Sequence, residues 1–408
     1  MATVFFALLV DIFSFTIILP LFPRLLEFYR KNEASDPTSL FSLTLAQLES
    51  FKALVGATGP RLDVVLFGGA IGSLFSLLQF AVSPFIGALS DKWGRKRVLM
   101  VCMVGNLASC ALWVVAKPFW VFVLSRVVGG LSEGNVQLSV AMISDITTAE
   151  TRSRGLLLVV ARRPGLNPYS ASALFAALLI FAEIIYLQVA LPETIHVHRA
   201  KQAAASASAA SSPVHIQAPT QSAKQQARTH LRTLSALHFA YLFLFSGLEF
   251  TLTFFTYDRF AYTNRQQGTL LGFIGLVASL VQGGYTRRRA HKVGEHRVAM
   301  QGIASCALGF ALLATTQRAS AQLWVGATML AFTSATVVTC LTTLASLQAS
   351  RGQAMGMFRS WGQLGRAMGP MVACAGYWVY GSKATYLVGS VGLGVVAMWL
   401  ARVEKRCR

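Results

Sequence analysis

Apolar runs long enough to cross a bilayer recur along the whole 408-residue chain. One crossing takes about 20 helical residues, because a helix rises 1.5 Å per residue through a hydrocarbon layer about 30 Å thick. The runs lie at residues 3–22, 64–86, 98–116, 119–142, 172–191, 234–256, 268–286, 298–314, 322–345, 353–377 and 384–400. The sequence therefore predicts an all-α, multi-pass integral membrane protein with eleven full spans.

Composition supports this class and argues against a nucleic-acid partner. Hydrophobic residues make up 54% of the chain and charged residues 13%, yet the formal net charge is +20. In a soluble protein that charge would suggest nucleic acid. Here the basic residues cluster in short links between apolar runs, which is the pattern of the positive-inside rule. The lipid bilayer is the expected partner, in a membrane that the sequence does not specify.

The sequence holds no pattern typical of an enzyme, a cofactor site or a metal site. Its six cysteines form no CxxC pair and no ligand cluster with histidine. The motifs of serine hydrolases, of phosphate-binding loops and of HExxH metalloenzymes are missing as well. We therefore expect a protein that is not an enzyme, with neither metal nor cofactor.

The apolar runs fall into two sets on either side of a polar linker. Residues 194–233 are rich in Ala and Ser, so we expect a disordered cytoplasmic linker between an N-terminal bundle (1–193) and a C-terminal bundle (234–402), with a basic tail at 403–408. The sets echo each other in a basic turn (87–97 and 283–289) and in an Arg-Gly pair (154–155 and 351–352). Repeated modules of this kind are shared by many secondary transporters.

The first basic turn, "GALSDKWGRKRV" (residues 87–98), concentrates charge directly after a span. Gly87 lets neighbouring helices approach closely, and Gly94 permits a tight turn. Asp91 can interact with the positive N-terminal end of another helix. The basic residues from Arg95 onward hold the turn on the cytoplasmic side. Charge alone leaves two interpretations open, a latch that gates the protein and a simple anchor of topology.

This turn resembles the cytoplasmic loop signature of the major facilitator superfamily, G-x-x-x-D-x-x-G-R-[KR]. "LLVDIFSFTIILPLFP", "LSRVVGG" and "AMISDITTAETRSRG" resemble stretches of its drug:proton antiporters, and "FLFSGLEFTLTFFTYDRF" is similar to its eukaryotic tetracycline-transporter-like, organic anion transporter-like branch. The resemblance implies two six-helix bundles around a central cavity. It also implies a cytoplasmic gate built from Gly87, Asp91, Gly94 and Arg95, with Asp145 as the acidic partner of Arg95.

Ionisable residues inside the apolar runs are functional candidates, because each costs roughly 3 kcal/mol or more at bilayer depth. They are Asp11, Arg126, Glu133, Glu183, Glu249, Arg359 and Arg366. In the resembled fold the first, fourth, seventh and tenth helices line the cavity, which places Asp11, Arg126, Glu133 and Glu249 on the substrate or proton pathway. Arg126 and Glu133 are seven apart and would share a helix face. The alternative is that these charges form satisfied pairs that hold helices together.

Arg359 and Arg366, also seven apart, favour an anionic substrate, since guanidinium offers a planar fork to carboxylate or phosphate. The alternative is that Arg359 reaches to the membrane surface and fixes the gate. Tetracycline antiporters use further acids in their third and ninth helices, where this chain has only Asn106 and no acid respectively. Organic anions are therefore the better prediction than tetracycline itself.

Two functions remain open at this point. One is a secondary active transporter of small organic solutes, organic anions or drugs, which acts by alternating access with proton coupling, most simply as a monomer. The other is a transport-inactive scaffold or regulatory protein, or a truncated isoform, that retains the fold. The membrane-depth charges favour the first.

A defect in the fifth span favours the second function. After Arg154-Gly155 only about 17 residues precede the next apolar run, and Arg162, Arg163 and Pro164 interrupt them. The segment 155–171 is too short to span alone. Only five full runs then separate the two basic turns, whereas two cytoplasmic turns require an even number of crossings. Either the second half is inverted against its charge bias, or about 15 residues are missing relative to a functional form; we favour the missing segment.

Overall fold

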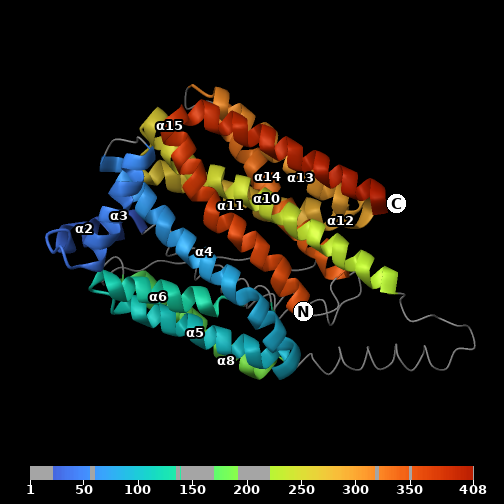
Figure 1. Cartoon of the computed structure of the whole chain (residues 1–408), viewed down its shortest axis with the longest axis horizontal. Helices are drawn as coiled ribbons and strands as arrows, with labels where there is room; N and C mark the ends of the chain where they lie inside the picture. The colour runs from blue at the N-terminus through green and yellow to red at the C-terminus, as the bar shows by residue number, and fades with distance from the viewer. Residues whose placement is uncertain are drawn as a thin grey trace, which may run out of the picture.

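A computed structural model of the chain shows a bundle of long helices (Figure 1). It describes residues 22–55, 60–134, 138, 170–191, 221–317, 321–348 and 352–407. Every regular element within these residues is helical, and eight helices are long and apolar enough to cross a membrane. The all-α membrane fold predicted from the apolar runs is therefore confirmed.

The helices of the first half are α2 (Phe22–Glu33), α3 (Leu40–Val55), α4 (Pro60–Trp93), α5 (Arg95–Val114), α6 (Phe119–Ser132) and α8 (Ser170–Ala190). Those of the second half are α10 (Gln221–Phe260), α11 (Asn264–Val281), a π-helical turn (Gln282–Thr286), α12 (Arg287–Val293), α13 (Glu295–Thr315), α14 (Ala321–Gln348) and α15 (Gly352–Cys407). Most of the predicted apolar runs coincide with these helices. The run 3–22 lies almost entirely outside the described residues, as does the segment 155–169.

Local sequence chemistry explains where several helices begin and turn. α11 begins at a capping box, in which the side chains of Thr263 and Gln266 each bond the backbone of the other residue. α15 turns back on itself at Gly381, whose φ of 81° is unfavourable for a residue with a side chain. Its two arms, which meet at the α15 label in Figure 1, correspond to the apolar runs 353–377 and 384–400.

Four boundaries differ from the sequence predictions. The link between the first two runs carries the helices α2 and α3. α10 begins at Gln221, inside the segment 194–233 that we expected to be disordered, because "QSAKQQARTHLR" lacks Gly and Pro and consists mostly of good helix formers. Helix α15 continues to Cys407, so most of the predicted tail 403–408 is helical. α6 ends at Ser132 and Glu133 has a ψ of 72°, so Glu133 does not continue the helix face of Arg126.

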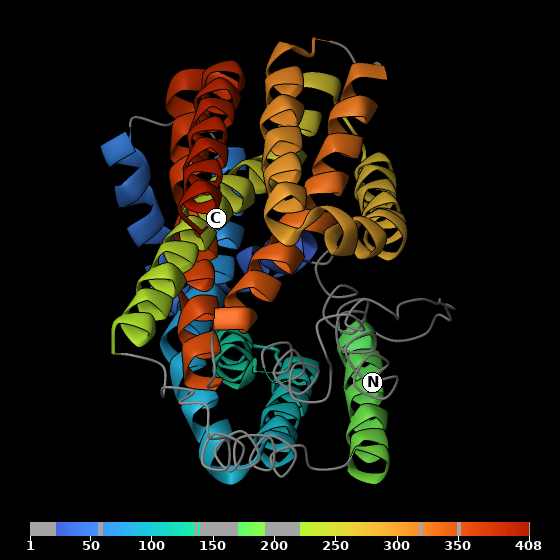
Figure 2. The same ribbon diagram turned by 90° about the vertical axis from the view of Figure 1, so that its right-hand side faces the viewer.

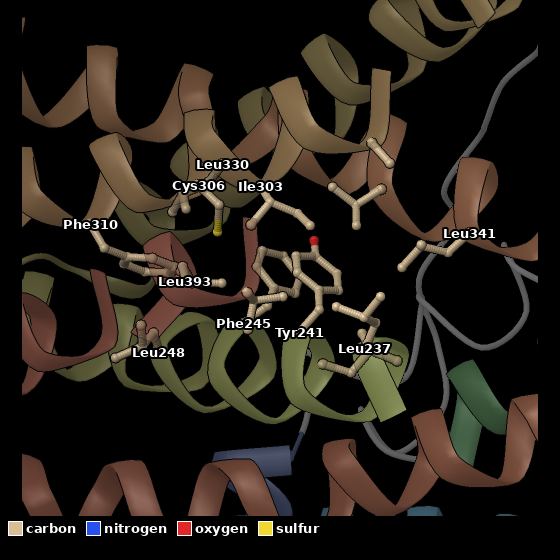
Figure 3. Close-up of a cluster of buried hydrophobic side chains, with 14 of the residues drawn as sticks. Leu237, Tyr241, Phe245, Leu248, Ile303, Cys306, Phe310, Leu330, Leu341 and Leu393 are labelled. Atoms are coloured by element: carbon tan, nitrogen blue, oxygen red, sulfur yellow. The ribbon is translucent and has the colours of Figure 1, made fainter. Parts of the chain in front are cut away.

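Each half has its own apolar core. In the second half, Tyr241 and Phe245 of α10 stack with ring centroids 5.5 Å apart. Cys306 of α13 and Leu330 of α14 pack around them (Figure 3). The first-half core gathers residues of α2 to α8 and also contacts Cys374 of α15. Figure 2 shows α11, α12 and α13 grouped apart from α5, α6 and α8. α4 and the first arm of α15 pack together and join the halves.

The two basic turns lie at the same end of the bundle, here named the basic end. The turn after α4 contacts the start of α15, at Gly352. The second basic turn, at α12, lies two spans after the start of α10. Near the start of α10, His230 packs against His296, which lies at the start of α13. Because α13 and α14 form a hairpin before Gly352, the start of α13 lies at the same end of the bundle as Gly352. Both basic turns and the start of α10 therefore lie at that end. The second half is therefore not inverted, and the positive-inside rule assigns the basic end to the cytoplasm.

Helices α6 and α8 run in the same direction. The start of α6, at Phe119, lies beside Tyr29 at the end opposite the basic end. The final turn of α8 reaches the basic end, where Lys96 Nζ donates to the carbonyl oxygen of Gln188 at 2.9 Å. Five described helices, α5, α6, α8, α10 and α11, therefore cross between the two basic turns, and residues 139–169 lie outside the described part of the chain. The predicted truncation at 155–171 stays a prediction.

Candidate functional site

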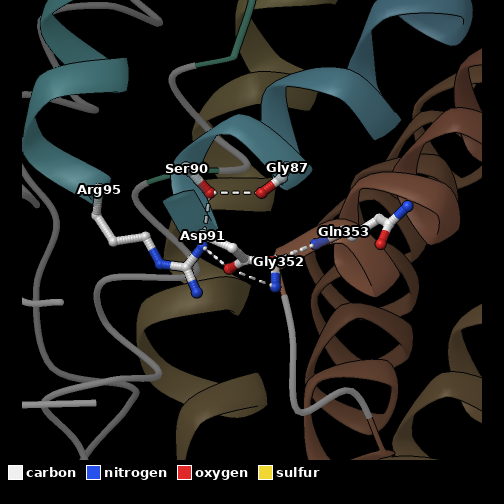
Figure 4. A network of polar contacts seen from close by, with 6 residues as sticks. All are labelled: Gly87, Ser90, Asp91, Arg95, Gly352 and Gln353. Atoms are coloured by element: carbon white, nitrogen blue, oxygen red, sulfur yellow. Dashed lines mark hydrogen bonds and ion pairs between the residues drawn. The ribbon is translucent and has the colours of Figure 1, made fainter. Parts of the chain in front are cut away.

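Asp91, in the last turn of α4, connects the two halves at the basic end (Figure 4). Its Oδ1 accepts a hydrogen bond from the backbone N–H of Gly352 at 3.0 Å, and its Oδ2 accepts from Gln353 N–H at 3.1 Å. These N–H groups belong to the first turn of α15, where the helix dipole favours a negative charge. Asp91 therefore does lie at the N-terminus of another helix, which the sequence could not identify.

Arg95 holds this carboxylate in place. Its Nη1 lies 2.7 Å from Asp91 Oδ1 and donates to Ser90 Oγ at 2.6 Å, and the Ser90 hydroxyl donates to the carbonyl oxygen of Gly87 at 2.8 Å. The Arg95 side chain is only 4% exposed, so the ion pair is largely shielded from water. We name Gly87, Ser90, Asp91, Arg95 and Gly352 the latch. Ser90 was not predicted from the sequence, where its only signal is a small polar side chain next to Asp91.

The latch leaves no room for a side chain at Gly352. A Cβ at this position would lie 2.8 Å from Asp91 Oδ1 and 3.0 Å from the carbonyl oxygen of Gly87, and it would overlap Arg95 Nη1. Farther along α15, the Ser360 hydroxyl donates to the carbonyl oxygen of Phe80 in α4 at 2.6 Å. These contacts between α4 and α15 hold the two halves together at the basic end.

Arg126 lies inside the first half, with 8% of its side chain exposed. Its guanidinium carbon is 4.7 Å from the ring centroid of Trp113 and 5.1 Å from that of Phe75, so two aromatic faces stabilise the charge. Nε of Arg126 makes no hydrogen bond with the residues that the structure describes. An arginine that is buried yet still offers a donor could bind an anionic group.

Glu133 connects the charges of the two halves. Its Oε2 accepts a hydrogen bond from Asn106 Nδ2 of α5 at 3.2 Å. It interacts electrostatically with Arg126 in its own half and, more strongly, with Arg359 of α15 in the other half. Three of the predicted site residues therefore come together, although Glu133 lies beyond the end of α6. The Asn106 contact was not foreseen.

Glu249 of α10 and Arg366 of α15 form a second charged group. The two side chains interact electrostatically, but no ion pair joins them in the described structure. Both side chains are exposed, although each lies far from the ends of a spanning helix. Arg366 also interacts electrostatically with the buried His238. Exposed charges at this depth require a water-filled space.

His238 is an interior residue that the sequence analysis missed. Its ring stacks on Phe358, with centroids 4.4 Å apart and an angle of 19°, and a Cβ at Gly362 would overlap it. It interacts electrostatically with Arg359 and Arg366. A single histidine in an apolar run was the only signal, and that pattern also fits an ordinary core residue.

Two predicted site residues, Asp11 and Asp145, lie outside the described residues. The described part of the chain contains no group of three or more His, Cys, Asp or Glu side chains placed to hold a metal ion. The arrangement therefore consists of a latch at one end and two interior charged groups, one reaching across both halves.

Two apolar-cored halves, joined by a polar latch and enclosing charges at membrane depth, define the class of multi-pass membrane transporters. A family model described as the Major Facilitator Superfamily matches residues 4–161 and 164–370, so the chain belongs to the major facilitator superfamily. It is an integral membrane protein and a secondary transporter of small organic solutes.

Known relatives agree with this assignment. The chain is 36% identical over 421 residues to human Major facilitator superfamily domain-containing protein 10, covering 97% of this chain and 91% of that protein. The class G tetracycline resistance protein of Vibrio anguillarum is 26% identical over 268 residues, 62% of this chain and 66% of its own. The crystal structure of the human organic anion transporter MFSD10 (TETRAN) matches with a TM-score of 0.81, 31% identity and 98% of both chains. The resemblance inferred from the sequence motifs is confirmed.

Proposed function

We propose that this chain carries organic anions across the membrane by alternating access, with Arg366 as the anion-binding residue. The observation that carries the proposal is the exposed residue Arg366 at membrane depth, which makes no ion pair with the described residues. A carboxylate that enters the interior would find there a planar, bidentate donor. The similarity to a human organic anion transporter supports the same substrate class.

Arg126 and Arg359 would complete the anion pathway. Arg359 interacts electrostatically with Glu133 across the halves, so an anion that binds Arg359 would compete with that attraction. Competition of this kind lets a solute bias the equilibrium between two arrangements of the halves, because it binds them with different affinity. Asp11 belongs to the same proposal, as a further acid on the pathway.

Uptake into proteoliposomes tests the substrate class. Radiolabelled benzoate and carboxyfluorescein would be compared with a monovalent organic cation of similar size, using wild type and the Arg366→Ala and Arg366→Lys variants. We expect anion uptake by wild type, a large loss with Arg366→Ala and a smaller one with Arg366→Lys, which keeps the charge but not the fork. Unchanged anion flux in Arg366→Ala, together with reduced cation flux, would refute the anion assignment.

We further propose that the transport is coupled to protons through Glu133 and Glu249. Each interacts electrostatically with an arginine, so protonation of the carboxylate would remove that attraction and favour binding of an anion by the arginine. Glu133→Gln and Glu249→Gln should abolish uptake driven by a pH gradient while leaving exchange of labelled for unlabelled anion. Loss of both activities would instead indicate a structural role. If wild type carries no solute in any assay, the scaffold function replaces this proposal.

A further inference from the structure

A cavity of about 240 Å³ lies where α3, α4 and α15 meet. It is lined by Thr44 and Gln47 of α3, by Ala70 of α4, and by Pro370, Met371 and Cys374 of α15. Most of its wall is apolar. The Thr44 hydroxyl is already bonded to the carbonyl oxygen of Leu40 at 2.7 Å, whereas the Gln47 amide makes no hydrogen bond with the described residues and remains available.

The cavity lies close to Arg366 along helix α15, on the side away from the basic end. Pro370 follows Arg366 by one helical turn on the same arm of α15, a rise of about 6 Å away from the basic end. The latch at Gly352 and the bond between Ser360 and Phe80 join the halves on the other side of Arg366. A solute would therefore reach Arg366 from the side on which this cavity lies.

Helix α3 belongs to the first half and would move with it. Phe41 packs edge-to-face on Phe119 of α6, with ring centroids 5.4 Å apart, and Leu48 is buried in the first-half core. The preceding helix α2 is fixed to the same half, since the Tyr29 hydroxyl donates to the carbonyl oxygen of Ala116 at 2.8 Å and Glu33 Oε1 accepts from Phe119 N–H at 2.7 Å. Across the cavity, Met371 belongs to the second half.

We propose that this cavity is an outer vestibule, in which the transported anion lies before it reaches Arg366, and that α3 is the first-half edge of the gate that closes over it. The inference rests on the proposed function and adds a binding site to it. The apolar wall suits an aromatic or aliphatic body, and the Gln47 amide supplies a donor for the carboxylate. The vestibule therefore favours amphipathic anions over small inorganic ones.

Cross-linking tests whether the gap between α3 and α15 must open. In Gln47→Cys/Met371→Cys, a bis-methanethiosulfonate reagent would tie the two halves together across the cavity. In the control pair Gln47→Cys/Ala70→Cys it would tie α3 to α4 within the first half. We expect uptake of carboxyfluorescein to fall about tenfold or more in the first pair and to recover with dithiothreitol, because a locked protein cannot alternate. Flux is compared in each pair before and after the reagent is added, and cross-linking should lower the flux of the control pair much less than that of the first pair.

Protection from labelling tests whether the anion occupies the cavity. Carboxyfluorescein should slow the reaction of a maleimide with Gln47→Cys and Met371→Cys. It should not slow the reaction with Ala46→Cys, which lies on the same helix but does not line the cavity. Normal wild-type flux with neither protection nor inhibition by the first cross-link would overturn the vestibule alone. Absence of wild-type anion flux would overturn the proposed function and the vestibule with it.

Discussion

The substitution Gly352→Ala should open the basic end of the transporter. A Cβ at 352 would lie 2.8 Å from Asp91 Oδ1, closer than real Cβ contacts, and 3.0 Å from the Gly87 carbonyl oxygen, tighter than nearly all of them. Because the Gly87 contact is to backbone, α15 must move away from α4. That movement lengthens the two hydrogen bonds from Gly352 and Gln353 to the Asp91 carboxylate.

The size of the effect follows from those two bonds. A hydrogen bond to a charged group contributes about 1.5–3 kcal/mol, and the separated groups regain part of this from water. We expect a net loss of about 2 kcal/mol from the state closed at the basic end, a factor of about 30 in the equilibrium between closed and open states. The latch lies far from Arg366 along α15, so affinity for the anion within the open state should not change.

The accessibility of a cysteine in place of Ser360 measures this shift. Ser360 is 2% exposed and bonds Phe80 of α4, so a maleimide reaches it only when α4 and α15 separate. The reaction should be about 10- to 30-fold faster with Gly352→Ala than without it. Gly284→Ala is the matched control, because a Cβ there meets nothing within 4 Å. Equal labelling rates and equal transport in all three proteins would refute the gating role and leave the latch as a topology anchor.

Two further substitutions test the same structure. Asp91→Asn keeps an acceptor for Gly352 N–H but removes the ion pair with Arg95, so turnover should slow several-fold while the Kd for the anion stays constant; a changed Kd with normal turnover would contradict this. Gly369→Ala should lower the unfolding free energy by about 1–3 kcal/mol, since its Cβ would overlap the Phe243 carbonyl oxygen and lie 2.8 Å from Ser246 Oγ. Thermal unfolding would be compared with Gly394→Ala, where nothing lies within 4 Å, and equal midpoints would argue against close packing of α10 on α15.

The spans could be predicted because the signal for a membrane helix is local: a run of apolar residues of sufficient length. Helix boundaries were harder, since they depend on contacts outside the run. α6 ends at Ser132, and the next residue, Glu133, accepts a hydrogen bond from Asn106 of α5 and interacts electrostatically with Arg359. Helices α2 and α3 were missed because mixed charge in their segment concealed the residues, such as Tyr29, that pack on α6.

In the candidate site, too, an interaction between residues close in the sequence could be predicted, and interactions between distant residues could not. Asp91 and Arg95 are four residues apart, so their pairing was readable from the motif. Gly352, the partner of Asp91, lies 261 residues away, and only the folded arrangement reveals it. The electrostatic interaction of Glu133 with Arg359 likewise joins two halves of the chain that lie far apart in the sequence.

The two basic turns repeat their backbone conformation but not their charges. Gly94 has φ 104° and ψ 148°, and Gly294 has φ 95° and ψ 144°, so the turns before α5 and α13 are equivalent. Aligned on these glycines, His291 takes the place of Asp91, and Glu295 takes that of Arg95. A histidine cannot supply a carboxylate to a helix N-terminus. The second turn therefore cannot form the same latch, and within the described residues the carboxylate that joins the two halves at the basic end is that of Asp91.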